Sequence, residues 1–470
     1  MSLPDSFSLL ILGQGSTGLD VARWALGHMG DPVSSVTVYG GGASEPTAAT
    51  RELEERGARF VCGSELVEGS YDICVASPGI SEFSSFFASA RAASAQIMGE
   101  PEFAFRLSPE RWCAITGTNG KTTTTRMLEH IMRASGMAAS AVGNIGRPAI
   151  DAVDSRSPGD WLVAELSSYQ LATCSELHPR AAILLNITPD HLAWHRSHDN
   201  YAAAKARVFT NMGEDDLAIV DVEDAGVRAY GELVLEPGRR VLSLGLADAG
   251  TPDAAFLDDG VLTVRLDGRE RPLLSRDDLG VVGDHNVLNA LAAAAAALFC
   301  GADEAGVRFG LSTFKPLEHR VEPCGEIGGV RYFNDSKATN TDAVLKALTA
   351  FEDDVVVLLL GGRDKGTPLE EFSSSVVERV RAAVCFGEAR ERFRRALEDA
   401  DVTSRIDIAE AEDLRDAVDV ARSLASCGDV VLLSPACASF DEFSGFEERG
   451  EAFKAYLASI AAGETDEERA

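Results

Sequence analysis

A glycine-rich loop that contains a lysine and a threonine is the clearest candidate for chemistry in this sequence. The run Gly117-Thr118-Asn119-Gly120-Lys121-Thr122 follows an apolar stretch and precedes a stretch of helical composition. Backbone N–H groups of such a turn can hold β- and γ-phosphates, the Lys121 ammonium can neutralise them, and the Thr122 hydroxyl can bind Mg²⁺. The full phosphate-loop pattern needs an earlier glycine where this chain has Ile115, so the loop is a shortened form. We expect it to bind nucleotide phosphates.

Acidic and imidazole groups stand at the ends of two further apolar runs. Glu165 lies at the end of Trp161–Leu166, and a polar cluster follows it; Asp190 and His191 follow Ala181–Asn186. Open α/β sheets bind ligands at the carboxyl ends of their strands, and Mg²⁺ prefers oxygen ligands. The pattern therefore predicts a metal site, with a solvated acid and a structural histidine as the alternatives.

A second glycine-rich turn lies near the start of the chain. The run Gly13-Gln14-Gly15-Ser16-Thr17-Gly18 follows Phe7–Leu12 and fits G-x-G-x-x-G. An NAD site should also place an acid about 20 residues further on, to bind the ribose hydroxyls. The next apolar run instead ends at Tyr39-Gly40-Gly41-Gly42, without an acid. NAD is therefore disfavoured, which leaves the diphosphate of another nucleotide or a turn that binds no ligand.

The elements that must position these groups follow an alternating pattern of short apolar runs and helical stretches. Continuous apolar runs favour parallel strands covered on both faces, so the fold class is α/β with open, mostly parallel sheets. The predicted strands are Phe7–Leu12, Val36–Tyr39, Tyr71–Ala76, Trp112–Thr116, Trp161–Leu166, Ala181–Asn186, Val355–Leu360, Ala382–Phe386 and Val430–Ser434. Helical composition marks Lys121–Ala134, Asn289–Phe299 and the helix-like segment Tyr201–Phe209. Breaks near 107 and 316 predict three domains, 1–107, 108–316 and 317–470.

The composition excludes several classes of protein. The chain has 470 residues, of which 45% are hydrophobic and 25% charged, as in ordinary globular proteins. A net charge of −31 argues against nucleic-acid binding, which needs a basic surface. No apolar run reaches the roughly 18 residues of a membrane span, and no signal peptide is recognisable. Nine cysteines without a C-x-x-C pair suggest neither disulfides nor zinc, so we expect a cytoplasmic protein.

Taken together, the motifs resemble those of the Mur ligase family, the ATP-dependent amide ligases of peptidoglycan precursor synthesis. The loop G-T-N-G-K-T is similar to that family's phosphate loop, and the resemblance extends to about Phe446. Later motifs are similar to those of the members that add D-glutamate to UDP-N-acetylmuramoyl-L-alanine. These motifs are Gly143–Gly146, Glu165–Gln170, Asn334–Asn340 and Leu433–Ser439.

The resemblance implies a fold and a role for each matching residue. The expected domains are Rossmann-like for the UDP-substrate, phosphate-loop ATPase-like in the centre, and Rossmann-like for the amino acid. ATP would be bound by Gly117, Thr118, Asn119, Gly120, Lys121, Thr122, Thr123, Asn286, Asn289, Arg320, Asp335 and Lys337. The UDP-substrate would be bound by Ser16, Thr17, Gly79, Asn144, Ser167 and Gln170. D-Glutamate would be bound by Thr339, Lys365, Ser439 and Phe446.

Catalysis and metal binding are likewise implied by the resemblance. Two Mg²⁺ ions would be held by Thr122, Glu165, His191 and Lys205. The catalytic residues would be Lys121, Glu165, His191 and Lys205, with Lys205 as a carbamate. Carbamylation turns an ammonium into a carboxylate, which suits a site beside a cation. Many members of the family place Asp or Thr after the second strand for the uracil, whereas this chain has Tyr39-Gly40-Gly41-Gly42, so the uracil contacts are not predicted.

The expected reaction is the phosphorylation of a substrate carboxylate by ATP, followed by attack of the D-glutamate amine on the acyl phosphate. The expected enzyme is a cytoplasmic monomer without nucleic-acid or membrane partners. Alternatives are a sibling ligase for another amino acid, an NAD-dependent oxidoreductase that uses the first glycine turn, and a nucleotide-dependent switch or scaffold.

Overall fold

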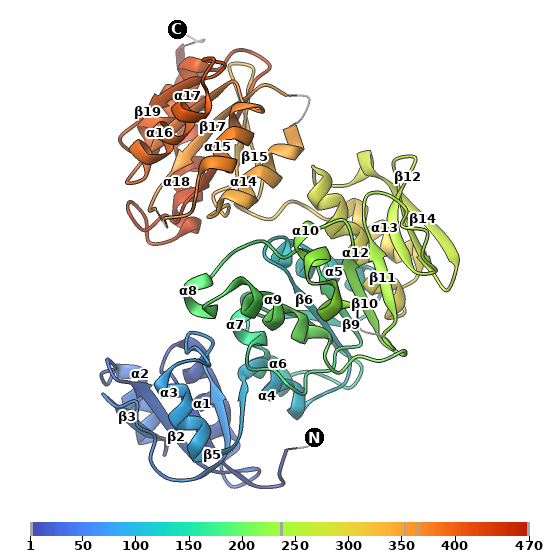
Figure 1. The fold of residues 1–470 in the computed structure, drawn as a ribbon, viewed down its shortest axis with the longest axis vertical. Coiled ribbons are helices and arrows are strands. Elements are labelled where there is room, and N and C mark those ends of the chain that lie inside the picture. Colours follow the sequence, from blue (N-terminus) through green and yellow to red (C-terminus); the bar gives the residue numbers. More distant parts are fainter. Residues whose placement is uncertain (1–2, 236–237, 352–353, 365, 468–470) are drawn as a thin grey trace. The chain divides into compact units, whose positions relative to one another are not determined.

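Three sheets organise the chain, each with helices beside it (Figure 1). The computed structural model describes residues 3–235, 238–351, 354–364 and 366–467. It divides into unit 1, Met1–Leu279 with Val287–Phe314, and unit 2, Gly280–Asn286 with Lys315–Ala470. Unit 1 holds the first two sheets and unit 2 the third. The predicted three-domain division at 107 and 316 stays a prediction.

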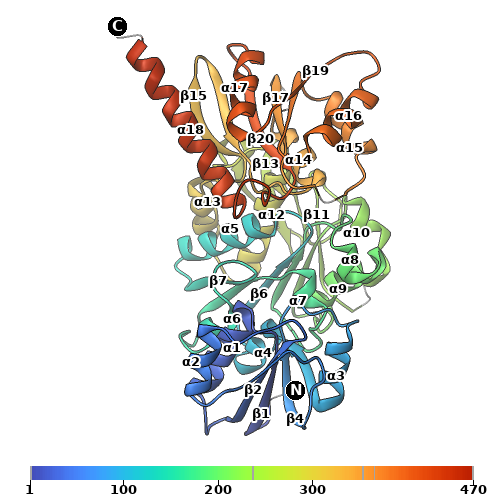
Figure 2. The same ribbon diagram turned by 90° about the vertical axis from the view of Figure 1, so that its left-hand side faces the viewer.

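The first sheet is entirely parallel, in the order β3-β2-β1-β4-β5. Its strands are β1 (Phe7–Leu12), β2 (Val33–Gly41), β3 (Arg59–Cys62), β4 (Tyr71–Ala76) and β5 (Ser94–Gly99). Its helices are α1 (Ser16–Gly27), α2 (Ala48–Glu55) and α3 (Ser85–Ala93). Helices α1 and α2 lie on one side and α3 on the other (Figure 2), so successive strand residues enter different cores. Leu9 packs in the core of α1 and α2, whereas Leu10 packs in that of α3.

The first glycine turn joins β1 to α1 and has a steric reason for its glycines. Gly13 has a φ of +91°, and a Cβ there would lie 2.8 Å from the Ser77 hydroxyl. A Cβ on Gly18 would lie 2.0 Å from the carbonyl oxygen of Gly13. Close packing of helix, turn and strand therefore accounts for both residues without any ligand.

The second sheet has the order β14-β13-β12-β11-β10-β9-β6-β8-β7. Its strands are β6 (Trp112–Thr116), β7 (Ala139–Gly143), β8 (Trp161–Glu165), β9 (Ala181–Leu184), β10 (Leu217–Asp221), β11 (Val241–Leu244), β12 (Ala254–Asp258), β13 (Val261–Leu266) and β14 (Arg269–Ser275). Its helices are α4 (Glu100–Leu107), α5 (Lys121–Ala134), α6 (Ala149–Val153), α7 (Ser168–Leu171), α8 (Leu192–His195), α9 (His198–Ala206), α10 (Ala225–Ala229), α11 (Gly231–Val234), α12 (Asp284–Phe299) and α13 (Glu304–Thr313), with short 3₁₀ turns at Arg207–Phe209 and Arg276–Asp278. Pairing is parallel from β7 to β12 and antiparallel from β12 to β14.

The third sheet has the order β15-β16-β20-β17-β18-β19 and is parallel apart from the β15–β16 hairpin. Its strands are β15 (Glu322–Ile327), β16 (Val330–Asn334), β17 (Val356–Gly361), β18 (Ala382–Phe386), β19 (Asp407–Glu410) and β20 (Val430–Ala436). Its helices are α14 (Thr341–Leu348), α15 (Glu370–Val377), α16 (Arg390–Ala400), α17 (Leu414–Leu424) and α18 (Phe446–Glu467), with a 3₁₀ turn at Thr349–Phe351. Residues of α14, α15 and α16 share one core, and those of α17 and α18 share the other. Among the residues described, no helix combines the length and apolarity that a membrane crossing needs.

Two buried glutamates at the start of α4 tie this helix to the second sheet's connections. The Glu100 carboxylate accepts a hydrogen bond from the Ile150 N–H at 2.7 Å, and Glu102 accepts from the N–H groups of Ser175 and Glu176. Burial raises the pKa of Glu100 to about 7, although the Ile150 bond opposes that rise. The stability of this junction should therefore depend on pH.

We expect the Glu100→Gln variant to lose less of its free energy of unfolding than the wild type when the pH rises to about 7 and above. The carboxyl group ionises near 4.5 when exposed but near 7 in the fold, so the unfolded chain loses this proton first. The stability linked to Glu100 is thus fully present below pH 4.5 and is lost as the pH rises to about 7. The effect is at most about 3 kcal/mol. Thermal unfolding at pH 5 and pH 8 should show a Tm gain for the variant only at pH 8, and the exposed control Glu55→Gln should show none.

Candidate active site

The phosphate-loop candidate connects the buried central strand β6 to helix α5. Gly117 and Gly120 have φ values of +152° and +82°, in the region that favours glycine. A Cβ on Gly120 would lie 2.6 Å from the Asn289 side-chain oxygen, so no other residue fits without movement. Gly120 is the N-cap residue of α5 and, having no side chain, caps none of the first N–H groups of this helix. This helix N-terminus is thus built to receive an anion.

Two lysines converge on a single carbonyl of this loop. The Lys121 ammonium donates to the Gly117 and Thr118 carbonyl oxygens at 2.9 and 2.8 Å, and the Lys205 ammonium donates to Gly117 at 2.6 Å. Lys205 is 1% exposed, and within the described ranges no ion pair links it to a carboxylate. Burial, followed by the charge of Lys121, lowers its pKa well below the ordinary value, while Asp190 opposes this. A buried lysine without a counterion is an expensive arrangement unless its chemistry is used.

Glu165 ends β8, the neighbour of β6, and pairs in register with Ile115. Its side chain is buried, and one carboxylate oxygen accepts from the Asn144 amide at 3.0 Å. The other oxygen, Oε2, is buried without any hydrogen-bond partner in the described part of the chain. A buried carboxylate oxygen that lacks a donor suits a cation. The donor set of Thr122 and Glu165 therefore fits Mg²⁺.

The polar turn after β8 is held by its own hydrogen bonds. The Ser167 N–H and hydroxyl donate to the Gln170 side-chain oxygen at 2.9 and 3.0 Å, and the Gln170 N–H donates to the Ser167 hydroxyl. These bonds form a capping box for α7. The local structure thus explains both residues, and their contact with the UDP-substrate stays a prediction.

His191 immediately precedes α8 in a left-handed conformation, with a φ of +54°. Its Nδ1 lies 3.5 Å from the Asp190 carboxylate, and its ring centroid lies 4.8 Å from that of Tyr169. The segment follows β9, the other neighbour of β6. His191 therefore belongs to the same sheet edge as the phosphate loop.

Two further residues of this site were not predicted. His195 is 1% exposed, and its Nε2 lies 2.9 Å from the Ser168 hydroxyl. Burial lowers its pKa to about 4, so its imidazole is neutral at pH 7. The Tyr201 hydroxyl lies 2.8 Å from the Thr118 hydroxyl, and its ring centroid lies 4.7 Å from the Lys205 nitrogen. The available signal was spacing, because His195 and Tyr201 stand four residues from His191 and Lys205 respectively.

The remaining predicted residues of unit 1 lie beside the phosphate loop or follow neighbouring strands of the first sheet. Asn289 of α12 accepts from the Thr124 hydroxyl at 3.0 Å, beside the phosphate loop. Ser16 and Thr17 open α1 after β1, and Gly79 follows β4, the strand next to β1. Gly40, near the end of β2, is a packing residue, since a Cβ there would lie 2.4 Å from the Ser44 hydroxyl.

In unit 2 the predicted residues follow two neighbouring strands, β16 and β20. Asp335 is buried; its carboxylate accepts from the Ser434 hydroxyl at 2.7 Å, and burial raises its pKa to about 7. The Lys337 ammonium lies 3.6 Å from the ring centroid of Phe446, the first residue of α18. Thr339 follows Lys337, and the buried Ser439 follows β20.

Three predicted residues remain, namely Arg320, Asn286 and Lys365. Arg320 precedes β15 and is close enough to Asp335 to lower its pKa, against the effect of burial. The Asn286 amide donates to the Val282 carbonyl at 2.7 Å. Lys365 lies outside the described residues, so its predicted role has no structural account.

The loop, the strand-end acid and the paired lysines define the class of phosphate-loop nucleotide-binding enzymes. The family model described as "Mur ligase middle domain" matches residues 115–297, and "Mur ligase, glutamate ligase domain" matches residues 319–437. The chain belongs to the Mur ligase family. This result confirms the predicted family and the ATP-dependent ligase class, and the sheets described above confirm the predicted α/β class with mostly parallel sheets.

Curated relatives cover nearly the whole chain. The UDP-N-acetylmuramoylalanine--D-glutamate ligase of Pelotomaculum thermopropionicum is 37% identical over 470 residues, 97% of this chain and 98% of the relative. The ligase of the same name from Geobacillus kaustophilus is 36% identical over 448 residues, 95% and 96% of the two chains.

Solved structures agree in fold. MurF from Acinetobacter baumannii has a TM-score of 0.59 at 17% identity and covers 85% of this chain and 92% of its own. The pseudomurein peptide ligase type C from Methanothermus fervidus has a TM-score of 0.56 at 17% identity, with 97% and 100% covered.

Proposed function

We propose that the protein joins D-glutamate to UDP-N-acetylmuramoyl-L-alanine with ATP as the energy source, in the cytoplasm and as a monomer. The observation that carries this proposal is the convergence of Lys121 and Lys205 on the Gly117 carbonyl, beside a strand that ends in the buried Glu165. The relatives named above are ligases of this specificity.

The proposed reaction has two steps. A carboxylate is a poor electrophile, so the substrate's terminal carboxylate first attacks the γ-phosphorus of ATP, which forms an acyl phosphate and releases ADP. The D-glutamate amine then attacks the acyl carbon, the tetrahedral intermediate expels inorganic phosphate, and the amine loses a proton. Such phosphoryl transfer depends mainly on positioning and on neutralisation of charge.

The residues of unit 1 divide the first step among them. The N–H groups of the loop 117–123 would hold the phosphates, and Lys121 would leave its carbonyl acceptors to neutralise the transferred group. Thr122 and Glu165 would hold one Mg²⁺, and His191 with carbamylated Lys205 would hold the second. Bound Mg²⁺ would disperse negative charge on the phosphates. The low pKa of Lys205 supports the carbamate, because only the neutral amine reacts with CO₂.

Substrate recognition would use the other predicted sets. Ser16, Thr17 and Gly79 would bind the UDP moiety, together with Asn144, Ser167 and Gln170. Asn286, Asn289 and Asp335 would bind the nucleoside of ATP, and Arg320 and Lys337 its phosphates. Thr339, Lys365, Ser439 and the Phe446 backbone would bind D-glutamate, whose two carboxylates require hydroxyl, ammonium and N–H donors.

The alternatives have weaker support. The oxidoreductase hypothesis relies on the first glycine turn, whose glycines are explained by packing. A sibling ligase for another amino acid is the closer competitor, because Mur ligases share the phosphate loop and differ in the substrate they add.

Phosphate release with UDP-N-acetylmuramoyl-L-alanine, ATP and a panel of D- and L-amino acids tests the proposal. We expect release with D-glutamate alone. Equal release with every amino acid, or release without any, would contradict the ligase assignment. Release with a different single amino acid would identify the sibling ligase.

A further inference from the structure

Arg449, in the first turn of α18, has a guanidinium that is fully buried in unit 2. Its Nε donates to the Ser336 hydroxyl at 2.9 Å, and its terminal nitrogens donate to carbonyl oxygens of Ser336 at 2.8 Å, Cys437 at 3.1 Å and Ala438 at 3.3 Å. A single side chain thus holds two of the motifs described above, D-S-K-A-T-N after β16 and S-P-A-C-A-S at β20.

A third strand end joins the same network. The Ala438 carbonyl also accepts from the Arg363 N–H at 2.8 Å, just after β17. A Cβ on the intervening Gly362 would lie 2.9 Å from the Arg449 guanidinium. Because β16, β20 and β17 are consecutive in the sheet, Arg449 links the carboxyl ends of three neighbouring strands.

The charge of Arg449 is balanced only from a distance, because Asp441, Glu442 and Asp335 raise its pKa without direct ion-pair contact. Within the described residues no ion pair includes it, and its acceptors are carbonyls and one hydroxyl. Burial lowers its pKa to about 10, so the guanidinium is still protonated at pH 7. A buried unpaired cation is costly, and well-packed apolar side chains replace buried charges without loss of stability in many proteins. Stability alone is therefore a weak reason for an arginine here.

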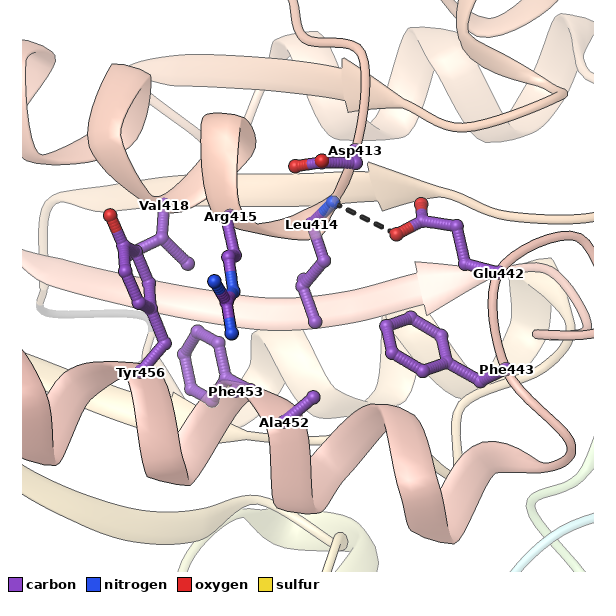
Figure 3. A pocket seen from close by; sticks show the side chains of 9 residues that line it. All are labelled: Asp413, Leu414, Arg415, Val418, Glu442, Phe443, Ala452, Phe453 and Tyr456. Carbon is purple, nitrogen blue, oxygen red and sulfur yellow. Dashed lines mark hydrogen bonds between the residues drawn. The ribbon is translucent and has the colours of Figure 1, made fainter.

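The hydrogen bonds of Arg449 and Ser336 restrain the two ends of the loop between Ala438 and Phe446. A cavity of about 180 Å³ borders this loop, lined by Glu442 and Phe443 from the loop itself and by residues of α17 and α18 (Figure 3). The middle of the loop is therefore incompletely packed. Its ends are tied, because the Ser336 hydroxyl donates to the Phe446 carbonyl at 2.8 Å while Arg449 holds both Ser336 and Ala438.

We propose that Arg449 is a positioning residue for the amino-acid subsite: it sets the spacing between the loops that carry Thr339, Ser439 and Phe446. This inference rests on the proposed function. The rigid guanidinium fork spans acceptors on two loops at once, which the single ammonium of a lysine cannot do.

Steady-state kinetics of the full chain test this role, with separate KM values for D-glutamate and for UDP-N-acetylmuramoyl-L-alanine. For Arg449→Met we expect the KM for D-glutamate to rise at least tenfold and the KM for the UDP-substrate to change less than twofold. The KM for ATP should rise too, because Asp335 and Lys337 flank Ser336. Arg449→Lys should lie between wild type and Arg449→Met.

The matched control is Arg381→Met, which removes an arginine bonded to Asp429 and Ser426 at the opposite end of the same sheet. It should lower Tm without changing either KM. If Arg449→Met does not fold, Arg449→Lys and Ser336→Ala are measured in its place, and each should raise the KM for D-glutamate more than the KM for the UDP-substrate. The inference is wrong if the Arg449 variants change both KM values equally. It is also wrong if they lower only kcat, in proportion to the loss of folded protein.

The wild type separates this inference from the proposed function. Wild-type protein that releases phosphate only with D-glutamate supports the function whatever the Arg449 variants do. If the wild type selects another amino acid, the KM comparison is made with that amino acid. A wild type that needs no amino acid overturns both.

Discussion

Lys121→Ala abolishes turnover in our expectation, with a fall in kcat/KM of at least about 10³-fold. The lysine opens α5 and already points into the phosphate loop, where it donates to Gly117 and Thr118. Alanine at this position has no ammonium group, so the negative charge that develops on the transferred phosphoryl group is no longer neutralised from the first residue of α5. Phosphate release under saturating D-glutamate measures the effect.

The control for this variant is Lys346→Ala. Lys346 forms a partly exposed pair with Asp342 on α14, at 3.2 Å, so its loss removes the same charge from a helix surface. Its rate should stay within about twofold of wild type, since such pairs contribute little. Thermal unfolding should show both variants folded. If Lys121→Ala releases phosphate at a rate close to that of the wild type, the predicted role of Lys121 in the phosphate loop is wrong.

Lys205→Ala should have the second largest effect, with kcat lower by about 10²–10³-fold. The side chain is 1% exposed and reaches the Gly117 carbonyl, so the truncation removes the group that would be carbamylated. An added small carboxylate such as acetate should restore part of the rate by occupying the space, whereas chloride at equal ionic strength should not.

Lys205→Arg separates carbamylation from charge. The guanidinium keeps a cation at this position but forms no carbamate, so neither activity nor acetate rescue is expected. A second readout is the ¹³C NMR signal of labelled bicarbonate on the protein, expected for wild type and absent from both variants. Near-normal activity of Lys205→Ala would show that the carbamate hypothesis is wrong.

Elements with strong local signals were predictable. The helix over Lys121–Ala134 has the predicted bounds, because the glycine before it and the periodic apolar residues define both its start and its buried face. The strands Trp112–Thr116 and Ala382–Phe386 also have the predicted bounds, since each is a continuous apolar run between parallel neighbours.

Elements whose stability depends on distant partners were missed. Strands β13, V-L-T-V-R-L, and β14, R-E-R-P-L-L-S, are antiparallel and interrupted by polar residues, so neither forms the continuous apolar run that predicted the parallel strands. The run 181–186 was predicted as strand throughout, but β9 ends at Leu184, because Asn186 leaves the ladder to hold the Asn119 N–H of the phosphate loop at 2.8 Å.

The site followed the same rule. Glu165 and the phosphate loop were identifiable from strand ends, and His195 had only its four-residue spacing from His191 as a signal. Arg449 had none, because its buried contacts are with segments far away in the sequence. Arg449 lies on a helix far along the chain from Ser336, and only the fold brings the two together.

Because the Gly117 carbonyl accepts from the side-chain nitrogens of two lysines, nucleotide binding at this loop is an exchange rather than an addition. Phosphate oxygens must displace the protein's own acceptors from Lys121, and the net gain is the difference between old and new bonds. The affinity of the loop for the triphosphate is therefore lower than it would be with an unbonded lysine. In return, the Lys121 ammonium is already oriented before the triphosphate binds.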